Sequence, residues 1–296
     1  MSCLSWNCHG IENPQTVTAL KRYIRLQNPA FVFIMETKLV KAELDSIFMQ
    51  LEFSKMHVVE CDTANGGRRG GMCLMWRDNF KFSLRSDSSH HIDGVVDDGE
   101  KIWRFVGVYG WPKEDMKYLT WKLLWDLADN QNSQWLCVGD FNEILFSFEK
   151  IGGRLRSDAK MEDFHNAIRE ANLDDLGYEG YSFTWTNGQT GADNIQERLD
   201  RCLGTLEWVQ LYPEYHIKHL PCISSDHCPI LINWYKRTRD RCTQGKGKKF
   251  SRFESMWLSD ESCQTIVRDA WNGDGGSTGI QAIKDKISNC GQSLKD

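Results

Sequence analysis

The stretch Gln134–Glu143 constrains the fold more than any other part of the sequence. Its apolar residues Trp135–Val138 are typical of a short strand that is buried on both faces. Gly139 then permits a sharp turn or a close backbone approach. If the backbone stays extended, Asp140 and Asn142 lie on the same side at the end of the strand, where α/β sheets carry their functional sites. Gly, Asp and Asn are also typical turn residues, so the tetrapeptide Gly-Asp-x-Asn taken alone favours a simple turn over a functional site.

Cysteine spacing and apolar content limit the class of protein. With 296 residues, 41% of them hydrophobic and 26% charged, the chain is long enough for one large core or for a core with a tail. Its eleven cysteines contain no C-x-x-C pair, so we expect neither a disulfide framework nor structural zinc, and we favour a reducing, intracellular setting. No apolar run reaches about eighteen residues, so we expect no membrane span. Strand-like residues begin at Cys3, which leaves no room for a signal peptide.

The first elements are predicted to be a strand, a helix and a strand. Cys3–Trp6 predicts a short strand that ends at Asn7, and the Asn-Pro pair at residues 13–14 is a typical helix start. Ala30–Met35 predicts a second buried strand, with Glu36 at its end. In a right-handed parallel crossover both strand ends lie on one edge of the sheet. Asn7 and Glu36 are therefore expected to be neighbours.

Further strands and helices follow in irregular alternation. The predicted strands are Met72–Trp76, Lys81–Arg85, Ile92–Val96, Ile102–Tyr109, Tyr181–Trp185, Ile195–Leu203, His216–Leu220 and Ile230–Trp234. Apolar faces predict helices at Met116, Leu119, Leu123 and Leu127, at Met161, Phe164, Ile168 and Ala171 after a cap at Ser157 or Asp158, and from the cap Thr205 through Leu211. The glycine-rich residues 66–71 lack the ending of a P-loop and predict a flexible turn. This mixture favours an α+β or α/β fold with two packed sheets.

A basic segment changes the character of the chain near residue 235. We expect a domain at residues 1–235, then a basic linker with a polar, partly helical tail at 236–296. The candidate nucleic-acid-binding residues in this segment are Lys236, Arg237, Arg239, Arg241, Lys246, Lys248 and Lys249, with Arg252 nearby. The whole chain has a net charge of −5, although residues 236–252 hold eight basic residues against one acid. The domain itself is therefore acidic, which is a poor match to a nucleic-acid binder unless its acids cluster around a metal. Most such segments are solvated linkers, but this one would also supply phosphate contacts.

Seven short motifs carry the strongest signal because of their order. They are W-N, M-E-T, G-V-Y-G, G-D-F-N, F-T-W, R-L-D-R and S-D-H. Taken singly, each fits a structural role: Tyr109 suits a core, Glu36 a cap, Asp200 an ion pair with its neighbouring arginines, and Asp226-His227 a surface pair. In this order, they resemble the endonuclease/exonuclease/phosphatase superfamily, which includes DNase I and the apurinic/apyrimidinic endonucleases. The resemblance runs from Trp6 to about Trp234.

Longer motifs resemble a narrower group. G-D-F-N-E, F-T-W-T-N-G, E-R-L-D-R and S-S-D-H-C-P-I look like the endonuclease domain of plant LINE-type (non-LTR) retrotransposons. In the tail, F-S-R-F-E-S-M-W-L resembles the segment that joins this endonuclease to a reverse transcriptase. No reverse-transcriptase motif follows in the sequence. We therefore expect a truncated element, a domesticated copy or an expressed fragment.

The resemblance implies a fold and a metal site. The fold is α/β, a four-layer α-β-β-α sandwich of the DNase I type with two packed mixed sheets and the site at one edge. Glu36 would be the main Mg²⁺ ligand, with Mn²⁺ as a possible substitute, and Asn7 would position or supplement it. Asp226 would support the metal side. The repair enzymes carry a carboxylate where this chain has His9, a departure that disfavours abasic-site repair.

The resemblance also implies catalytic roles. Asp140 would orient or deprotonate the attacking water, Asn142 would hold phosphate and water, and Tyr109 would hydrogen-bond a phosphate oxygen. His227, oriented by Asp200, would stabilise the charge of the transition state. Such a set suits the chemistry independently, because hydrolysis of an anionic phosphodiester needs a hard cation, a base and donors aimed at the developing charge.

The function expected from these features is Mg²⁺-dependent DNA cleavage. We expect an endonuclease that nicks one strand, leaves a 3′-hydroxyl and acts in the nucleus. One alternative is a phosphatase of the same fold that acts on inositol lipids or nucleotides, although such enzymes carry W-C-D-R where this chain has R-L-D-R. Another is a non-catalytic relic whose basic segment binds nucleic acid.

Overall fold

The structure is a computed structural model that describes residues 1–78, 80–128 and 134–235, together with residues 265, 267–269, 271, 286 and 290. One compact unit spans Met1–Arg237 and another spans Thr238–Asp296. Residues 236–252, the predicted basic segment, lie outside the described residues. The boundary near 235 and the character of the tail therefore stay predictions. In the described part of the chain, no helix is both long and apolar enough to span a membrane.

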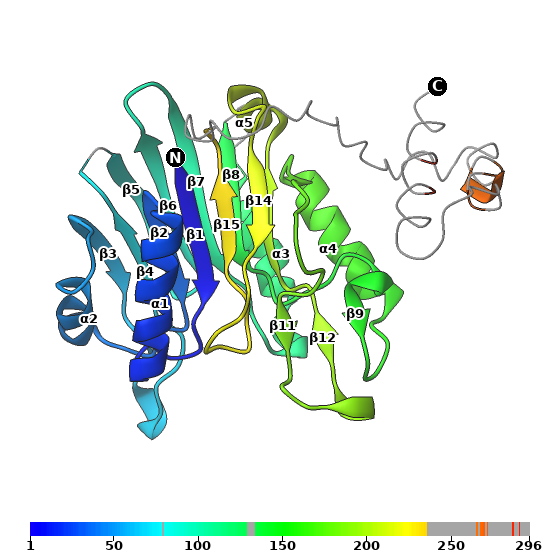
Figure 1. Cartoon of the computed structure of the whole chain (residues 1–296), viewed down its shortest axis with the longest axis horizontal. Coiled ribbons are helices and arrows are strands. Elements are labelled where there is room, and N and C mark those ends of the chain that lie inside the picture. The colour runs from blue at the N-terminus through cyan, green and yellow to red at the C-terminus, as the bar shows by residue number, and fades with distance from the viewer. Residues whose placement is uncertain are drawn as a thin grey trace. The chain divides into compact units, whose positions relative to one another are not determined.

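One mixed sheet is built around the first strand of the chain (Figure 1). Its strands, in spatial order, are β14 (His216–His219), β15 (Ile230–Asn233), β1 (Ser2–Asn7), β2 (Phe31–Met35), β4 (Met72–Trp76) and β3 (Lys55–Val59). β1 and β2 run parallel and the other neighbours antiparallel. The predicted parallel crossover is thus confirmed, and it brings the ends of β1 and β2 to one edge.

The stretch Gln134–Glu143, which most constrains the fold, contributes a central strand to a second mixed sheet. Its strands, in order, are β10 (Asp174–Asp175), β13 (Asp200–Gly204), β8 (Trp135–Asp140), β7 (Ile102–Tyr109), β6 (His91–Asp97) and β5 (Lys81–Ser88). β8 runs parallel to β7 and antiparallel to β13, so the last residue of β8 lies opposite the first of β13. A small sheet of β11 (Trp185–Thr186), β12 (Gln196–Glu197) and β9 (Lys150–Ile151) lies at the same edge (Figure 1).

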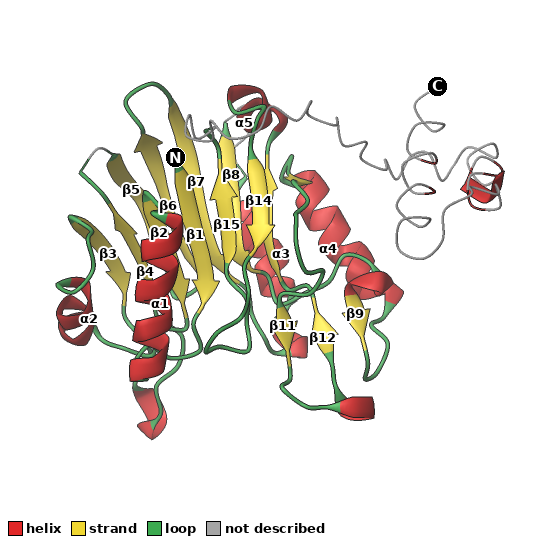
Figure 2. Ribbon diagram, in the orientation of Figure 1, coloured by secondary structure: helices red, strands yellow, loops and turns green. Residues whose placement is uncertain are grey.

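Helices cover the outer face of each sheet (Figure 2). The helices are α1 (Pro14–Gln27), α2 (Lys41–Phe48), α3 (Tyr118–Leu127), α4 (Asp158–Glu170) and α5 (Leu206–Leu211), with 3₁₀ turns at Ala64–Gly66, Glu114–Met116, Ser147–Glu149 and Gly191–Asp193. α1 packs on the first sheet, and α3 and α4 pack on the second. The predicted four-layer α-β-β-α sandwich is confirmed.

Local sequence signals set the ends of several helices. Asn13 caps α1 by accepting a hydrogen bond from the backbone N–H of Gln15, and Asn28 ends the helix in the left-handed conformation, with φ of 47°. Thr205 caps α5 in the same way through the N–H of Trp208. A short polar side chain satisfies a free backbone donor of the first turn in both cases, which is why the sequence predicted these starts.

The two sheets pack closely because Gly107 of the second sheet faces the aromatic ring of Phe33 in the first. A Cβ atom at Gly107 of β7 would lie 2.6 Å from the ring of Phe33 on β2. Phe33 in turn meets Phe105 edge to face, with ring centroids 6.0 Å apart. At Gly139, with φ of 150°, a Cβ atom would lie 1.9 Å from the carbonyl oxygen of Val108. This confirms that Gly139 permits a close backbone approach just before Asp140.

The buried face of α3 differs from the predicted one. Met116 precedes the helix, and Leu119 and Leu123 are only partly buried, whereas Trp121, Leu124 and Leu127 face the core. The reason is tertiary packing, because Trp121 stacks on Phe164 of α4 with centroids 4.7 Å apart. The predicted face of α4, in contrast, is confirmed.

Two predicted strands and one prediction about cysteines need correction. Tyr181–Trp185 is not a full strand, because pairing begins only at Trp185, opposite Glu197. Ile195–Leu203 divides into β12 and β13, since the chain leaves the small sheet to join the second sheet. α2 and β3 were not predicted. A disulfide joins Cys222 and Cys228, although the cysteine spacing predicted no disulfide framework.

A buried ion network supports the strand that begins at Asp200. The fully buried Arg201 donates hydrogen bonds to Glu149 and Asp175, and Arg198 donates to the same two carboxylates. The arginines that flank Asp200 in the sequence therefore pair elsewhere. The alternative of a local ion pair at Asp200 is wrong, and its carboxylate remains free for the site.

We predict that Arg201→Met lowers the free energy of unfolding by about 3–5 kcal/mol, because it leaves buried carboxylates without one of their two partners. Urea unfolding followed by circular dichroism measures this loss. The matched control is Lys218→Met, which removes an exposed lysine 3.8 Å from Glu179 and should cost less than about 1 kcal/mol. Equal losses in the two variants would contradict the supporting role of the network.

Candidate active site

Asn7 connects the two sheets at their common edge. Its side-chain Nδ2 donates to Glu36 Oε1 and to Asp140 Oδ2, each at 3.0 Å. Glu36 follows β2, and Asp140 ends β8 of the other sheet. Asn7 and Glu36 are thus neighbours, as the crossover predicted. One amide group holds two carboxylates at a fixed separation, which partly offsets their mutual repulsion.

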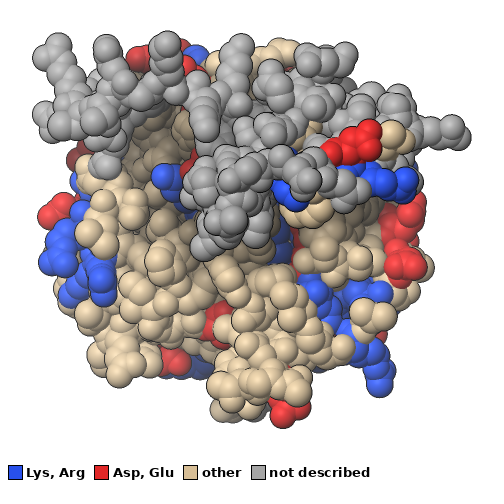
Figure 3. All heavy atoms as spheres, turned by 45° about the vertical axis from the view of Figure 1, so that its right-hand side comes forward, with Lys and Arg blue, Asp and Glu red and all other residues tan. Residues whose placement is uncertain are grey.

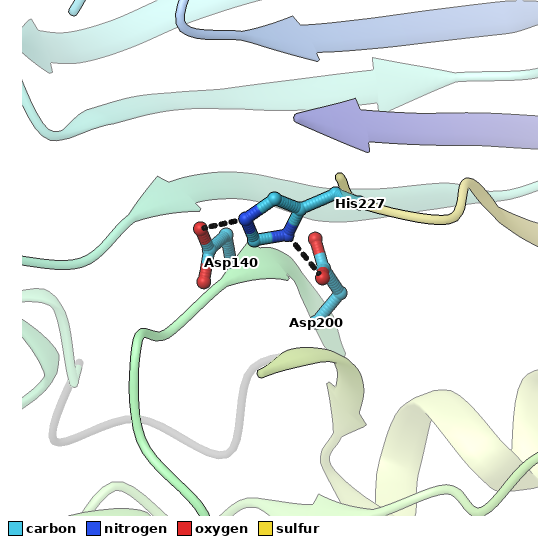
Figure 4. A group of neighbouring side chains, drawn as sticks. All are labelled: Asp140, Asp200 and His227. Atoms are coloured by element: carbon cyan, nitrogen blue, oxygen red, sulfur yellow. Dashed lines mark hydrogen bonds and ion pairs between the residues drawn. The ribbon is translucent and has the colours of Figure 1, made fainter. Parts of the chain in front are cut away.

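His227 lies between two buried carboxylates (Figure 4). Its Nδ1 donates to Asp200 Oδ2 at 2.8 Å, and its Nε2 is 3.7 Å from Asp140 Oδ2. The ring and both carboxylates are almost fully buried. Asp200 and Asp140 face each other across the β13–β8 pair, so the sheet register sets the spacing that receives the ring.

The charges in this group depend on one another. Burial lowers the pKa of His227, but the charges of Asp200 and Asp140 outweigh that effect and raise it to about 10. Burial raises the pKa of Asp140 to about 7, against the opposing charge of His227. At neutral pH, His227 is therefore an imidazolium with two N–H donors. Asp140 can gain or lose a proton near neutral pH, as a general base requires.

Tyr109 and Asn142 complete the inner part of the site. The Tyr109 hydroxyl donates to Glu36 Oε1 at 2.9 Å, and burial, together with the Glu36 charge, keeps its pKa well above the ordinary value. Asn142 has φ of 55°, so the backbone turns there and does not stay extended. Its backbone N–H donates to Asp140 Oδ1 at 2.8 Å. The turn and the site are thus the same feature of the G-D-F-N motif.

Asp226 forms the outer part of the site with two partners that the sequence did not predict. Its Oδ1 accepts from His9 Nδ1 at 3.0 Å, and its Oδ2 accepts from Trp185 Nε1 at 2.9 Å. Burial raises the pKa of Asp226, but the hydrogen bond from His9 and the charge of His227 hold it well below the usual range. The side chain of His9 is 54% exposed, so this pair lies at the mouth of the site.

Supporting residues fix these groups in place. The hydroxyl of the buried Thr184 accepts from the backbone N–H of Asp200 at 2.9 Å. Ser225 Oγ donates to the Asn7 carbonyl at 2.9 Å. Lys38 lies with Nζ 3.7 Å from Glu36 Oε2. All three residues stand in or beside quoted motifs, but nothing in their local sequence indicates these long-range contacts.

The donor set fits a hard divalent cation on the Glu36 side. Asp140, Asp200 and His227 offer ligand atoms within 4.8 Å of one another, but a protonated imidazole donates hydrogen bonds and does not ligate a metal. Glu36 and Asp226 keep partly exposed carboxylates, at 18% and 30%. Carboxylate oxygens are the ligands that Mg²⁺ prefers. Both amide hydrogens of Asn7 are donated to carboxylates, so the role of Asn7 is to hold Glu36 in position.

The structure therefore brings together all eight catalytic and metal residues predicted from the sequence: Asn7, Glu36, Tyr109, Asp140, Asn142, Asp200, Asp226 and His227. They come from both sheets and from the loop before β15. The eight basic residues at 236–252 lie outside the described residues. Their contacts with nucleic acid stay a prediction.

Several solved structures share this architecture. The endonuclease domain of TRAS1, a telomere-specific non-LTR retrotransposon, has 14% sequence identity and a TM-score of 0.60, over 80% of this chain and 99% of that chain. The catalytic domain of Xenopus laevis APE2 has 16% identity and a TM-score of 0.61, over 79% and 91%. The AP endonuclease LMAP from Leishmania major has 15% identity and a TM-score of 0.59, over 78% and 86%.

At this level of identity, the structural matches support the DNase I-like fold alone. A search of the curated proteins finds no match. The family model named Endonuclease/Exonuclease/phosphatase family, however, matches residues 4–227. That range includes every residue of the inner site, from Asn7 to His227. This chain belongs to the endonuclease/exonuclease/phosphatase family.

Proposed function

We propose that this protein is a divalent-metal-dependent endonuclease that nicks one strand of DNA and leaves a 3′-hydroxyl. The observation that carries the proposal is the connected group of Glu36, Asn7, Asp140, His227 and Asp200, which spans the edge of both sheets. It provides carboxylates for a cation, a candidate base and a protonated donor in one place. The retrotransposon endonuclease among the structural matches supports DNA as the substrate.

The residues would act on a phosphodiester as follows. Asp140, with its pKa raised to about 7, takes a proton from the attacking water. The His227 imidazolium donates to a phosphate oxygen as negative charge develops, and Asp200 keeps the ring oriented. The water oxygen forms a bond to phosphorus, the bond from phosphorus to the 3′-oxygen breaks, and that oxygen takes a proton from solvent and leaves as a hydroxyl. When bound by Glu36 and Asp226, a Mg²⁺ or Mn²⁺ ion would neutralise phosphate charge.

The charge on one face of the molecule favours a separate source of DNA affinity. On the face shown in Figure 3, acidic and basic side chains are interspersed among mostly uncharged atoms. A mixed surface of this kind attracts a polyanion weakly, because its charges partly cancel. The basic residues at 236–252 therefore have a role in the proposal as a cationic arm that contacts phosphates without reading sequence.

We predict that Glu36→Gln reduces plasmid nicking by at least about 100-fold at low millimolar Mg²⁺, because the cation loses its charged ligand. Calorimetric titration without DNA should also register weaker Mg²⁺ binding. Glu43→Gln is the matched control, since Glu43 pairs with Arg68 on the surface, and it should behave like the wild type. Normal nicking and metal binding in Glu36→Gln would exclude Glu36 as the ligand. A parallel assay of phosphomonoester hydrolysis separates the endonuclease from the phosphatase alternative.

We predict that Asp200→Asn lowers the pKa of His227 and slows nicking. It should leave the affinity for Mg²⁺ unchanged. The folded-state pKa is raised from 6.5 to about 10. Protonated His227 therefore adds stability below about pH 6.5, and this stability is lost as the pH rises through about 10. Titration of the labelled His227 ring by NMR in the metal-free protein should give a midpoint closer to the ordinary value in the variant. Nicking should fall on the order of 100-fold, whereas a large loss of Mg²⁺ affinity would place Asp200 among the ligands.

We predict that neutralising the basic segment weakens DNA binding without changing the catalytic step. The variant replaces by glutamine Arg239, Arg241, Lys246, Lys248, Lys249 and Arg252. The slope of log affinity against log salt should flatten by about 0.9 for each DNA phosphate that the variant no longer neutralises. Turnover at saturating DNA should match the wild type. An unchanged slope would show that the segment is only a linker.

A further inference from the structure

The loop that carries Asp226 and His227 is closed by a disulfide. Cys222 and Cys228 are bonded, with Cα atoms 4.4 Å apart. Cys222 is exposed and Cys228 is buried. Because thiols attack a disulfide at a sulfur they can reach, the exposed side makes this bond accessible to a reductant. The loop between the two cysteines holds one residue of the metal side and one of the catalytic side.

The same loop sets the position of His227 relative to β1. Ser225 Oγ donates to the Asn7 carbonyl at 2.9 Å and accepts from the His227 backbone N–H at 3.1 Å. The His227 carbonyl accepts from Trp6 Nε1 at 3.1 Å. These bonds connect the loop to the strand that ends at Asn7. A shift of the loop would therefore move His227 and Asp226 together relative to the other site residues.

The two arms of the loop are held differently. In the second arm, the backbone N–H of Cys228 donates to the Thr184 carbonyl at 2.7 Å, and the chain then enters β15. In the first arm, Pro221, Cys222 and Ile223 are exposed, and the Pro221 carbonyl accepts a hydrogen bond from the Tyr23 hydroxyl at 2.6 Å. The disulfide connects this exposed arm directly to the buried one. Reduction would thus free the segment that follows Pro221, while Pro221 keeps its bond to Tyr23 and the second arm stays anchored.

Open space beside the loop gives the first arm room to move. A pocket of about 500 Å³ is lined by both cysteines and by Tyr181, Phe183, Trp185 and Leu220, among others. Trp185 is also the residue that donates to Asp226. Displacement of the arm into this pocket would disturb no packed core, because the space is not filled by side chains of the described residues. Closed and open arrangements of the loop are therefore both sterically accessible.

Other cysteines of the Met1–Arg237 unit are poor sites for the same chemistry. Those in the described residues outside this pair are all buried: Cys3, Cys8, Cys61, Cys73, Cys137 and Cys202. Burial raises the pKa of each of these thiols, so the reactive thiolate is disfavoured. Redox chemistry in this unit is thus concentrated at the loop of the proposed active site.

We propose that Cys222 and Cys228 form a reversible redox modification site that holds the catalytic loop closed when oxidised and releases it when reduced. A dithiol supplies two electrons and two protons, the S–S bond becomes two thiols, and the dithiol becomes a disulfide. The oxidised protein has the arrangement described above. In the reduced protein, the loop keeps its other hydrogen bonds but loses its covalent closure, so Asp226 and His227 are held less tightly. The consequence for nicking rests on the proposed function, whereas the movement of the loop does not.

The test compares the full chain before and after reduction with dithiothreitol, followed by desalting under argon. Differential alkylation and mass spectrometry report the state of Cys222 and Cys228, NMR of the labelled His227 ring reports the loop, and plasmid nicking reports activity. Cys222→Ser cannot form the bond. Cys290→Ser is the matched control, because Cys290 is a free cysteine outside the loop.

Reduction should lower wild-type nicking by about three- to tenfold, the change expected when a held segment becomes open for most of the time, and should shift the His227 signals. Cys290→Ser should respond like the wild type. Cys222→Ser should stay at the reduced level in both conditions. An unchanged His227 spectrum on reduction, or no disulfide-linked peptide in the oxidised sample, overturns the proposal. If the spectrum shifts but no form nicks DNA, the redox site stands and the proposed endonuclease function fails.

Discussion

The site depends on a single amide group that joins two sheets. Asn7 Nδ2 donates to Glu36 and to Asp140, residues that end strands of different sheets. Because like charges at close range raise the energy of both carboxylates, a donor between them stabilises the arrangement before any cation binds. The contact requires the two sheet edges to be level, which in turn depends on the close packing of Gly107 against Phe33. The inter-sheet core and the site chemistry therefore share one geometric requirement.

The buried carboxylates form two groups with different partners: Glu149 and Asp175 pair with arginines, and Asp200 pairs with His227. Glu149 and Asp175 take the arginines on either side of Asp200, and this leaves Asp200 to hold His227. If those arginines paired with Asp200 instead, its charge would be neutralised locally and the raised pKa of His227 would fall. The ion network is thus more than structural support for β13. By taking the arginines, it preserves the negative charge that keeps the imidazole protonated.

Sequence reasoning succeeded where short-range physics decides the outcome. The cap at Asn13, the buried run that became β8 and the crossover that places Asn7 beside Glu36 all follow from local preferences or chain handedness. It failed where distant packing decides. The face of α3 follows Trp121 and its stacking on α4, and the His9–Asp226 contact joins residues 217 positions apart. The Cys222–Cys228 bond escaped because spacing alone carries no information about how a loop folds back.

The inner site explains phosphate chemistry better than it explains substrate choice. Asp140, Asp200 and His227 are almost completely buried, and in the proposed function they act on the phosphorus centre that phosphodiesters and phosphomonoesters have in common. Discrimination between such substrates must come from groups that reach the rest of the molecule. In this chain, these are the exposed His9 with its partner Asp226 and the aromatic residues that surround Trp185. They belong to the same rim that the disulfide closes. Under the two proposals, substrate selection and loop closure therefore depend on the same outer residues, whereas Asn7, Asp140 and Asp200 behind them are positioned by strands of the two sheets.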